Sequence, residues 1–126
     1  MSRKARSAVD AEVQEVVFDS AAELFAVLST PIRLKIISVL CHGEKNVSEL
    51  LDEIDTTQPN MSQHLATLYR AGVLGRRREG TQIRYRLESK RVATLCRAVC
   101  TQVAIEIGGD SRMPPQERLL PRAART

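Results

Sequence analysis

The chain has 126 residues, a length that fits one domain with a modest hydrophobic core. Hydrophobic residues make up 43% of it, but with two Phe, two Tyr and no Trp the core has to be aliphatic, which suits packed helices better than a β-sandwich. The net charge of +4 is mild, no apolar run reaches the roughly 18 residues of a membrane span, and the first residues lack the apolar stretch of a secretory signal. We therefore expect a cytoplasmic protein without a membrane partner.

Three parts are predicted along the chain. Residues 1–16 are polar and are expected to form a flexible arm, and residues 17–107 carry the pattern of a folded domain. Residues 108–126 are rich in Gly, Pro and Arg, a composition typical of a disordered tail. We therefore expect one folded unit between two mobile ends.

Two helices are predicted at the start of the domain. Asp19 or Ser20 can cap the first, because short polar side chains accept hydrogen bonds from the first turn of a helix. Pro31 is tolerated in a first turn and begins the second helix, which ends at Gly43. Apolar residues recur at helical spacing in both: Ala22, Phe25, Ala26 and Leu28, then Leu34, Ile36, Ile37, Val39, Leu40 and Cys41.

The next segment has the pattern of a helix-turn-helix. "NVSELLDEI" predicts a short helix, Thr56 and Thr57 the turn and cap, and "QPNMSQHLATLYRA" a second helix with Pro59 in its first turn and Gly72 after its end. The first helix is expected to direct its apolar residues inward: Val47, Leu50, Leu51 and Ile54.

The second of these helices separates its residues by character. At 100° per residue, Met61, Leu65 and Leu68 fall on one side. Amide, hydroxyl and guanidinium groups fall on the other side, and such groups read base edges and hold phosphates in a DNA groove. The residues of this polar side are Asn60, Gln63, Thr67 and Arg70. Any surface helix can carry polar residues, so this helix alone does not predict DNA binding. The segment that follows it supplies the further evidence.

That segment is a basic hairpin. Residues 70–91 hold eight basic and two acidic residues, a net charge of +6, against −2 for the rest of the chain. "VLGRRREGTQIRYRL" predicts two strands around Glu79-Gly80, with apolar residues alternating against polar ones. The apolar positions are Val73, Ile83, Tyr85 and Leu87, and the polar ones Gln82, Arg84 and Arg86.

A basic hairpin directly after a helix of this kind is typical of a winged helix-turn-helix that binds double-stranded DNA. We predict that Gln63 and Thr67 read bases, and that Arg77, Arg78 and Arg84 hold the DNA backbone. The full predicted set is Gln58, Asn60, Ser62, Gln63, Thr67, Arg70, Arg76, Arg77, Arg78 and Arg84. The alternatives are a merely solvated hairpin and a winged helix that binds a protein partner.

A last helix is predicted over "KRVATLCRAVCTQVAIEI". It places one apolar strip along its length: Val92, Cys96, Val99, Cys100, Val103 and Ile107. Such a strip on a terminal helix of so small a domain usually needs a partner, and a two-fold dimer is the commonest one. The predicted fold class is therefore mainly α (α+β), with about five helices and one β-hairpin wing.

This order of elements, with "LSTPIRLKIISVL", "VSELLDEIDTTQPNMSQHLATLYRAGVL" and "RREGTQIRYRL", resembles the ArsR/SmtB family of bacterial repressors over roughly residues 18–103. The resemblance implies a homodimer paired through the first and last helices. It also implies binding to an inverted-repeat operator, which is released when a ligand or a chemical modification reaches the sensor site.

The sensor sites of that family are absent or shifted here. Its zinc-type site uses Asp and His on the last helix, but the two histidines of this chain are His42 and His64, and its arsenic-type cysteine cluster is missing from "NVSELLD". What remains is Cys41 after the second helix and Cys96 and Cys100 on the last. This is most similar to the subgroup that senses reactive sulfur species or oxidants through two cysteines, although Cys41 lies about a turn later and Cys100 about a turn earlier than in that subgroup.

We expect Cys41 and Cys100 to form the sensor, with Cys96 as a third candidate; each can also be a plain core residue. Thiolates suit polysulfide or disulfide bridging, and equally the capture of As(III), Cd(II) or Cu(I) by all three cysteines. No cofactor and no metal site is predicted under the sulfur hypothesis, and the small inducer stays unidentified. An enzyme is not predicted, because no base stands at a recognisable spacing from a nucleophile.

Overall fold

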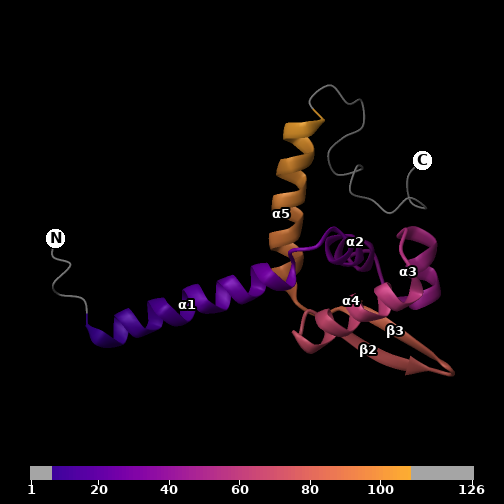
Figure 1. Cartoon of the computed structure of the whole chain (residues 1–126), viewed down its shortest axis with the longest axis horizontal. Coiled ribbons are helices and arrows are strands. Elements are labelled where there is room, and N and C mark those ends of the chain that lie inside the picture. Colours follow the sequence, from indigo (N-terminus) through magenta and orange to yellow (C-terminus); the bar gives the residue numbers. More distant parts are fainter. Residues whose placement is uncertain (1–6, 109–126) are drawn as a thin grey trace.

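The computed structural model describes residues 7–108, which form five helices and a small antiparallel sheet (Figure 1). This arrangement is the predicted winged helix-turn-helix. The elements are α1 (Ala8–Val27), α2 (Pro31–Leu40), β1 (Lys45–Asn46), α3 (Val47–Glu53), α4 (Gln58–Arg70), β2 (Leu74–Glu79), β3 (Gln82–Leu87) and α5 (Lys90–Ile107).

Helix α1 begins much earlier than the sequence prediction. Ser7 caps it by accepting a hydrogen bond from the backbone N–H of Asp10, so the expected start at Asp19 or Ser20 is wrong, and residues 8–16 are helical rather than a flexible arm. The physical reason is that no Gly or Pro interrupts residues 8–27, and an interior Asp or Ser costs a helix little. Residues 1–6 and the predicted disordered tail beyond Gly108 lie outside the described residues.

The core lies between α2, α3, α4, the sheet and the first half of α5. Pro31 opens α2, as expected, and Thr30 caps it. The predicted inward face of α4 is confirmed, since Met61, Leu65 and Leu68 are all 0% exposed. Other fully or nearly buried residues come from the remaining elements: Ile36, Ile37, Val39, Leu40, Leu50, Ile54, Val73, Leu74, Tyr85 and Val92.

The sheet has the strand order β1-β3-β2, and all its pairs are antiparallel. Glu79 pairs with Gln82, so the hairpin turn consists of Gly80 and Thr81, one residue later than predicted. Gly80 has a φ of +63°, a backbone conformation that glycine adopts without strain. Strand β1 was not predicted, because two residues are too short to show an alternating pattern; it pairs with β3 through Lys45 and Asn46.

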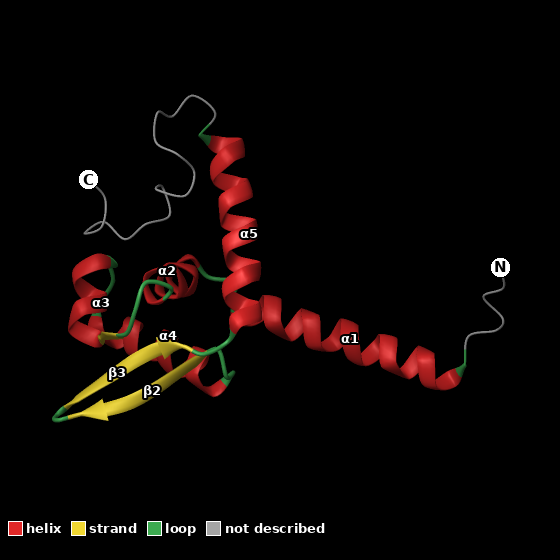
Figure 2. Ribbon diagram, turned by 180° about the vertical axis from the view of Figure 1, so that it is seen from behind, coloured by secondary structure: helices red, strands yellow, loops and turns green. Residues whose placement is uncertain are grey.

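Two helices leave apolar residues uncovered in a single chain. In Figures 1 and 2, α1 projects away from the rest of the molecule, and the second half of α5 rises beyond α2. Helix α1 buries none of its residues, and the predicted strip of α5 is buried only at Val92 and Cys96. The exposed apolar residues of the two helices are Val9, Val13, Val16, Val17, Phe18 and Phe25, and Val99, Val103, Ile105 and Ile107. Between residues 7 and 108, no helix is long and apolar enough to cross a lipid bilayer.

Candidate nucleic-acid interface

Helix α4 packs against the core with its apolar side, so that its polar side faces solvent. Thr57 caps it, Pro59 lies in its first turn, and its buried side is held in the core. With that side fixed, the opposite one must point outward, and Gln58, Ser62 and Gln63 are exposed. These three predicted site residues therefore lie together on the outer surface of α4.

Two other predicted residues of α4 are already engaged. The hydroxyl of Thr67 donates a hydrogen bond to the backbone carbonyl of Gln63, 3.1 Å away, and the amide of Asn60 donates one to the hydroxyl of Thr56 over 2.7 Å. Asn60 thus stabilises the turn before α4. By contrast, Gln63 and Arg70 have exposed side chains, and neither makes a side-chain hydrogen bond or ion pair within the described part of the chain.

Arg76 joins the wing to the end of α4. Its guanidinium carbon lies 3.9 Å from the centre of the Tyr69 ring, which is a cation–π contact. A hydrogen bond with Tyr85 is the main cause that raises the pKa of Arg76, and Tyr69 adds to it. Tyr69 itself is 38% exposed. The side of the hairpin that carries Arg76 therefore faces α4.

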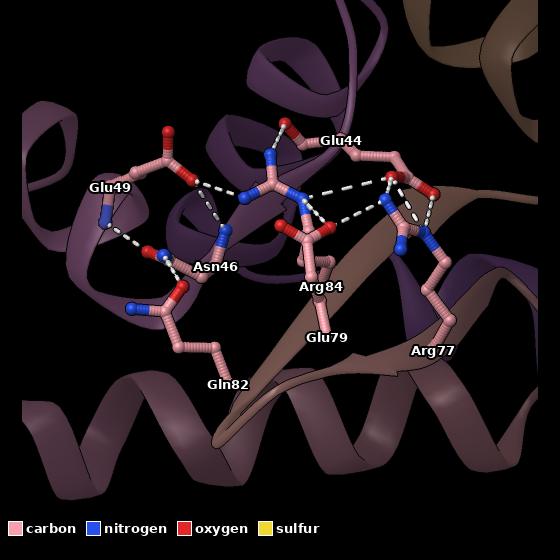
Figure 3. A network of polar contacts seen from close by, with 7 residues as sticks. All are labelled: Glu44, Asn46, Glu49, Arg77, Glu79, Gln82 and Arg84. Atoms are coloured by element: carbon pink, nitrogen blue, oxygen red, sulfur yellow. Dashed lines mark hydrogen bonds and ion pairs between the residues drawn. The ribbon is translucent and has the colours of Figure 1, made fainter.

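Arg77 and Arg84 lie in a polar network on the other side of the hairpin (Figure 3). Arg77 forms ion pairs with Glu44 and Glu79, both at 2.9 Å. Arg84 donates hydrogen bonds to the backbone carbonyl of Glu44 at 3.1 Å and to the carboxylate of Glu49 at 3.2 Å. The two arginines are cross-strand neighbours, and the carboxylates compensate the repulsion between them.

Arg78 differs from the other wing arginines. It is exposed, and it makes no ion pair with any residue that the structure describes. Arg86, two residues after Arg84 on β3, pairs with Glu88 at 3.0 Å. The structure therefore brings all the predicted DNA-binding residues to α4 and the wing. Among the described residues, Arg76 and Arg78 are the wing arginines without a carboxylate partner, and of these two only Arg78 has no side-chain contact to Tyr69 or Tyr85 either.

Comparison with known proteins agrees with this geometry. The family described as bacterial regulatory protein, arsR family, matches residues 30–74. A probable mercury resistance operon repressor of Streptomyces lividans is 35% identical over 91 residues, which cover 72% of this chain and 73% of the relative. The chain belongs to the ArsR family.

Two further similarities extend over more of the relatives. A biofilm growth-associated repressor of Xylella fastidiosa is 39% identical over 88 residues, 67% of this chain and 77% of the relative. The crystal structure of the transcriptional repressor BigR from Xylella fastidiosa superposes with a TM-score of 0.67 at 37% identity, over 72% of this chain and 93% of that chain. This ArsR-family chain is accordingly a DNA-binding transcriptional repressor, and its relatives are regulators rather than enzymes.

The three cysteines of this ArsR-family repressor lie where α2 packs against α5. Cys41 follows the last residue of α2 and is half-buried against the core, Cys96 is 8% exposed, and Cys100 follows one turn later. Burial raises the pKa of Cys96 to about 11, with smaller contributions from Cys100 and Cys41. Burial also raises the pKa of Cys100. Of the two thiols on α5, Cys96 is therefore the one whose pKa burial raises further.

The histidines of the ArsR-family chain lie apart from those thiols. His42 is exposed, and His64 is half-buried on the flank of α4, where it accepts a hydrogen bond from Arg33. Within residues 7–108 of one chain, no three His, Cys, Asp or Glu side chains are grouped so that they could hold a metal ion.

Sequence reasoning missed the acidic partners of the wing. Asn46 and Glu49 form a capping box at the start of α3, and the Asn-x-x-Glu spacing before an apolar run was a readable signal for it. Glu44 had no such signal, because its partners Arg77 and Arg84 are more than thirty positions away.

Proposed function

We propose that this ArsR-family repressor binds an inverted-repeat operator as a homodimer, with α4 of each chain in a major groove and the wing beside the DNA backbone. The observation that carries this proposal is the exposed polar surface of α4, formed by Gln58, Ser62 and Gln63, which lies opposite a buried apolar side and is flanked by a cationic hairpin. Operator DNA lies in the cytoplasm of a bacterium, so the predicted location follows from this role.

The roles of the side chains follow from their exposure. Gln63 is the best placed base reader, because its amide is exposed and can pair with an adenine edge. Thr67 can accept a hydrogen bond from a base amino group through its oxygen lone pairs, because its own proton is engaged by the backbone of Gln63. Arg70 and Arg78 have no intramolecular partner among the described residues and are the proposed phosphate contacts. Gln58, Ser62 and Arg76 complete the surface.

The dimer is proposed from the uncovered apolar residues of α1 and α5. Contiguous exposed apolar surface on a small domain usually marks an interaction site. Because the residues lie on two helices that leave the body of the molecule, a second copy can cover them with the same surface in a two-fold arrangement. An inverted-repeat operator matches that symmetry.

We further propose that release from the operator follows modification of Cys41 and Cys100 by a reactive sulfur species or an oxidant. Both thiols are partly accessible and lie on helices that pack together, whereas Cys96 is buried. A sulfur bridge between Cys41 and Cys100 would change the position of α2 relative to α5, one of the two helices proposed to form the dimer. Because α2 contacts α4, the separation of the two recognition helices would change with it.

A soft metal or metalloid is the second candidate inducer, as As(III), Cd(II) or Cu(I). The observation in its favour is that Cys96 and Cys100 stand one helical turn apart and that Cys41 lies close enough to affect the pKa of Cys96, and thiolates prefer soft metals. The three thiols of one chain would have to move closer together to hold an ion, because the described residues form no such group. The relative from Streptomyces lividans is named as a probable mercury resistance operon repressor, and mercury is, like these ions, a thiophilic metal. A protein-interaction module is not favoured, because the chain belongs to a family of DNA-binding regulators.

The decisive experiment measures binding of the purified chain to its own upstream DNA by fluorescence anisotropy, with scrambled DNA of equal length as the control. Specific binding at physiological salt that weakens steeply as salt rises is expected, because several phosphates are neutralised. Equal affinity for both DNAs would contradict the proposal.

A further inference from the structure

Arg84 occupies the centre of the sheet. Its strand, β3, lies between β1 and β2, and Arg84 itself is the neighbour of Asn46 on one side and of Arg77 on the other. Its side chain is only 20% exposed, the lowest value among the arginines of the ion pairs at the wing. A phosphate group would thus reach Arg84 less easily than the other wing arginines.

All three nitrogens of the Arg84 guanidinium have polar partners within the protein. One terminal nitrogen, Nη2, donates to the backbone carbonyl of Glu44, and the other, Nη1, donates to Oε1 of Glu49. Its Nε lies 3.7 Å from a carboxylate oxygen of Glu44 and 3.9 Å from one of Glu79. These partners belong to the connection between α2 and β1, to α3 and to β2, so one side chain joins the wing to the helix-turn-helix unit (Figure 3).

The charge around Arg84 does not favour a phosphate. Arg77 and Arg84 face three carboxylates, those of Glu44, Glu49 and Glu79, so the cluster has a net charge of −1. A hydrogen bond from Arg77 holds the pKa of Glu44 below its ordinary value, so that carboxylate is ionised at neutral pH. DNA therefore meets a compensated site here, and an uncompensated one at Arg78.

The alternation of the strand explains the difference between the two arginines. Successive side chains of a strand point to opposite sides of the sheet, so Arg78 shares its side with Arg76, which contacts Tyr69 of α4. Arg77 and Arg84 share the opposite side, which faces Glu44 and the start of α3.

We propose that Arg84 is a positioning residue for DNA binding: it fixes the wing to the helix-turn-helix unit through Glu44 and Glu49, and leaves the phosphate contact to Arg78. This inference rests on the proposed function, because it concerns how the wing meets the operator. It replaces the phosphate contact that the sequence predicted for Arg84. A second tie supports it, since the amide of Asn46 donates a hydrogen bond to Gln82 of β3 over 2.8 Å.

The first test compares Arg84→Lys and Arg84→Gln with the matched pair Arg78→Lys and Arg78→Gln, measuring operator affinity over a range of salt concentrations. A lysine keeps the charge but cannot reach the three partners of Arg84 at once. We expect both Arg84 variants to bind about threefold to tenfold more weakly with an unchanged salt slope, because a network of ion pairs is worth more than one exposed pair. Arg78→Lys should bind like the wild type, and Arg78→Gln should lower the slope by about 0.9, the amount expected when one phosphate is no longer neutralised.

The inference is overturned if Arg84→Lys binds like the wild type while Arg84→Gln lowers the salt slope, or if both Arg84 variants keep the wild-type affinity. The change in operator affinity caused by Glu44→Gln has opposite signs if Arg84 contacts a phosphate and if it positions the wing. It removes a negative charge near DNA and would strengthen binding if Arg84 held a phosphate, whereas a positioning role predicts weaker binding.

A measurement without DNA separates this inference from the proposed function. Hydrogen exchange of the backbone amides of residues 74–87 should become severalfold faster in Arg84→Gln and Glu44→Gln, and should be unchanged in Arg78→Gln. Wild-type exchange in the first two variants would refute the inference even if the operator is bound. Failure of the wild-type chain to bind its upstream DNA would refute the proposed function instead, and the exchange result would still stand.

Discussion

Arg33 in α2 donates a hydrogen bond from Nε to Nδ1 of His64 in α4, over 3.1 Å. The same guanidinium donates from Nη1 to the backbone carbonyl of Val27 at the end of α1, over 3.0 Å. One side chain of α2 therefore connects α1, which is proposed to take part in the dimer, with α4, the proposed recognition helix. The arrangement requires a neutral His64, because a protonated imidazole has no acceptor to offer Arg33.

We expect acid to destabilise the fold through His64. Burial, and secondarily the charge of Arg33, lowers the pKa of His64 below its ordinary 6.5. As the pH falls below about 6.5, the unfolded state takes up this proton before the folded state does, so the free energy of unfolding decreases down to the folded pKa. Urea unfolding at a series of pH values should therefore show a smaller pH dependence in His64→Asn, which cannot titrate. The exposed His42→Asn is the matched control, and equal pH dependence in His64→Asn and the wild type would contradict the prediction.

Gln63→Ala should weaken operator binding by about 1–3 kcal/mol and binding to scrambled DNA much less, because an amide that pairs with a base edge discriminates between sequences. Anisotropy titrations at one fixed salt concentration measure both values. Gln102→Ala, on the exposed side of α5, is the control and should leave both unchanged. An equal loss on the two DNAs would show that Gln63 does not read a base.

Val103→Glu should convert the dimer into a monomer, because it places a charge in the apolar surface of α5. Sedimentation at micromolar concentration checks the mass. The variant should also lose affinity for the full operator, since a dimer with recognition helices about 34 Å apart meets two half-sites at once. Thr94→Glu, exposed on α5 outside the strip, should stay dimeric. A wild-type monomer that binds a single half-site would exclude this assembly.

Cys41→Ser and Cys100→Ser should stay on the operator after treatment with polysulfide or peroxide, and Cys96→Ser should be released almost like the wild type. The reason is that Cys96 is buried, which raises its pKa to about 11, whereas Cys41 and Cys100 are partly accessible to the reagent. Intact-mass analysis of each sample identifies the bridge that has formed. If Cys41→Ser is released and Cys96→Ser is not, the switch lies within α5, and the metal or metalloid hypothesis becomes the better one.

The sequence alone determined the parts of this repressor that depend on neighbouring residues. The inward side of α4 was readable because Met61, Leu65 and Leu68 recur at the period of a helix. The start of α2 was readable because proline is tolerated in the first turn of a helix but not in its interior, and Pro31 lies in that first turn. The hairpin turn was located to within one residue by Gly80. The resemblance to the ArsR family rests on the same segments, and the family match over residues 30–74 confirms it.

Local pattern was a weaker guide to the start of α1. The polar character of the first residues suggested a mobile arm, but residues 8–17 contain no helix breaker, and Ser7 supplies a cap. The valines of residues 8–17 remain exposed in one chain, so their burial depends on a partner rather than on the sequence of α1.

Only the tertiary structure separated residues of the same chemical type. Arg78 and Arg84 are both wing arginines, but they differ in function as proposed here because Glu44, forty positions before Arg84, lies beside one and not the other. Cys96 and Cys100 share one helix and differ because only Cys96 is covered by the core. Ion pairs and burial depend on which distant segments meet, and no periodicity within one segment contains that information.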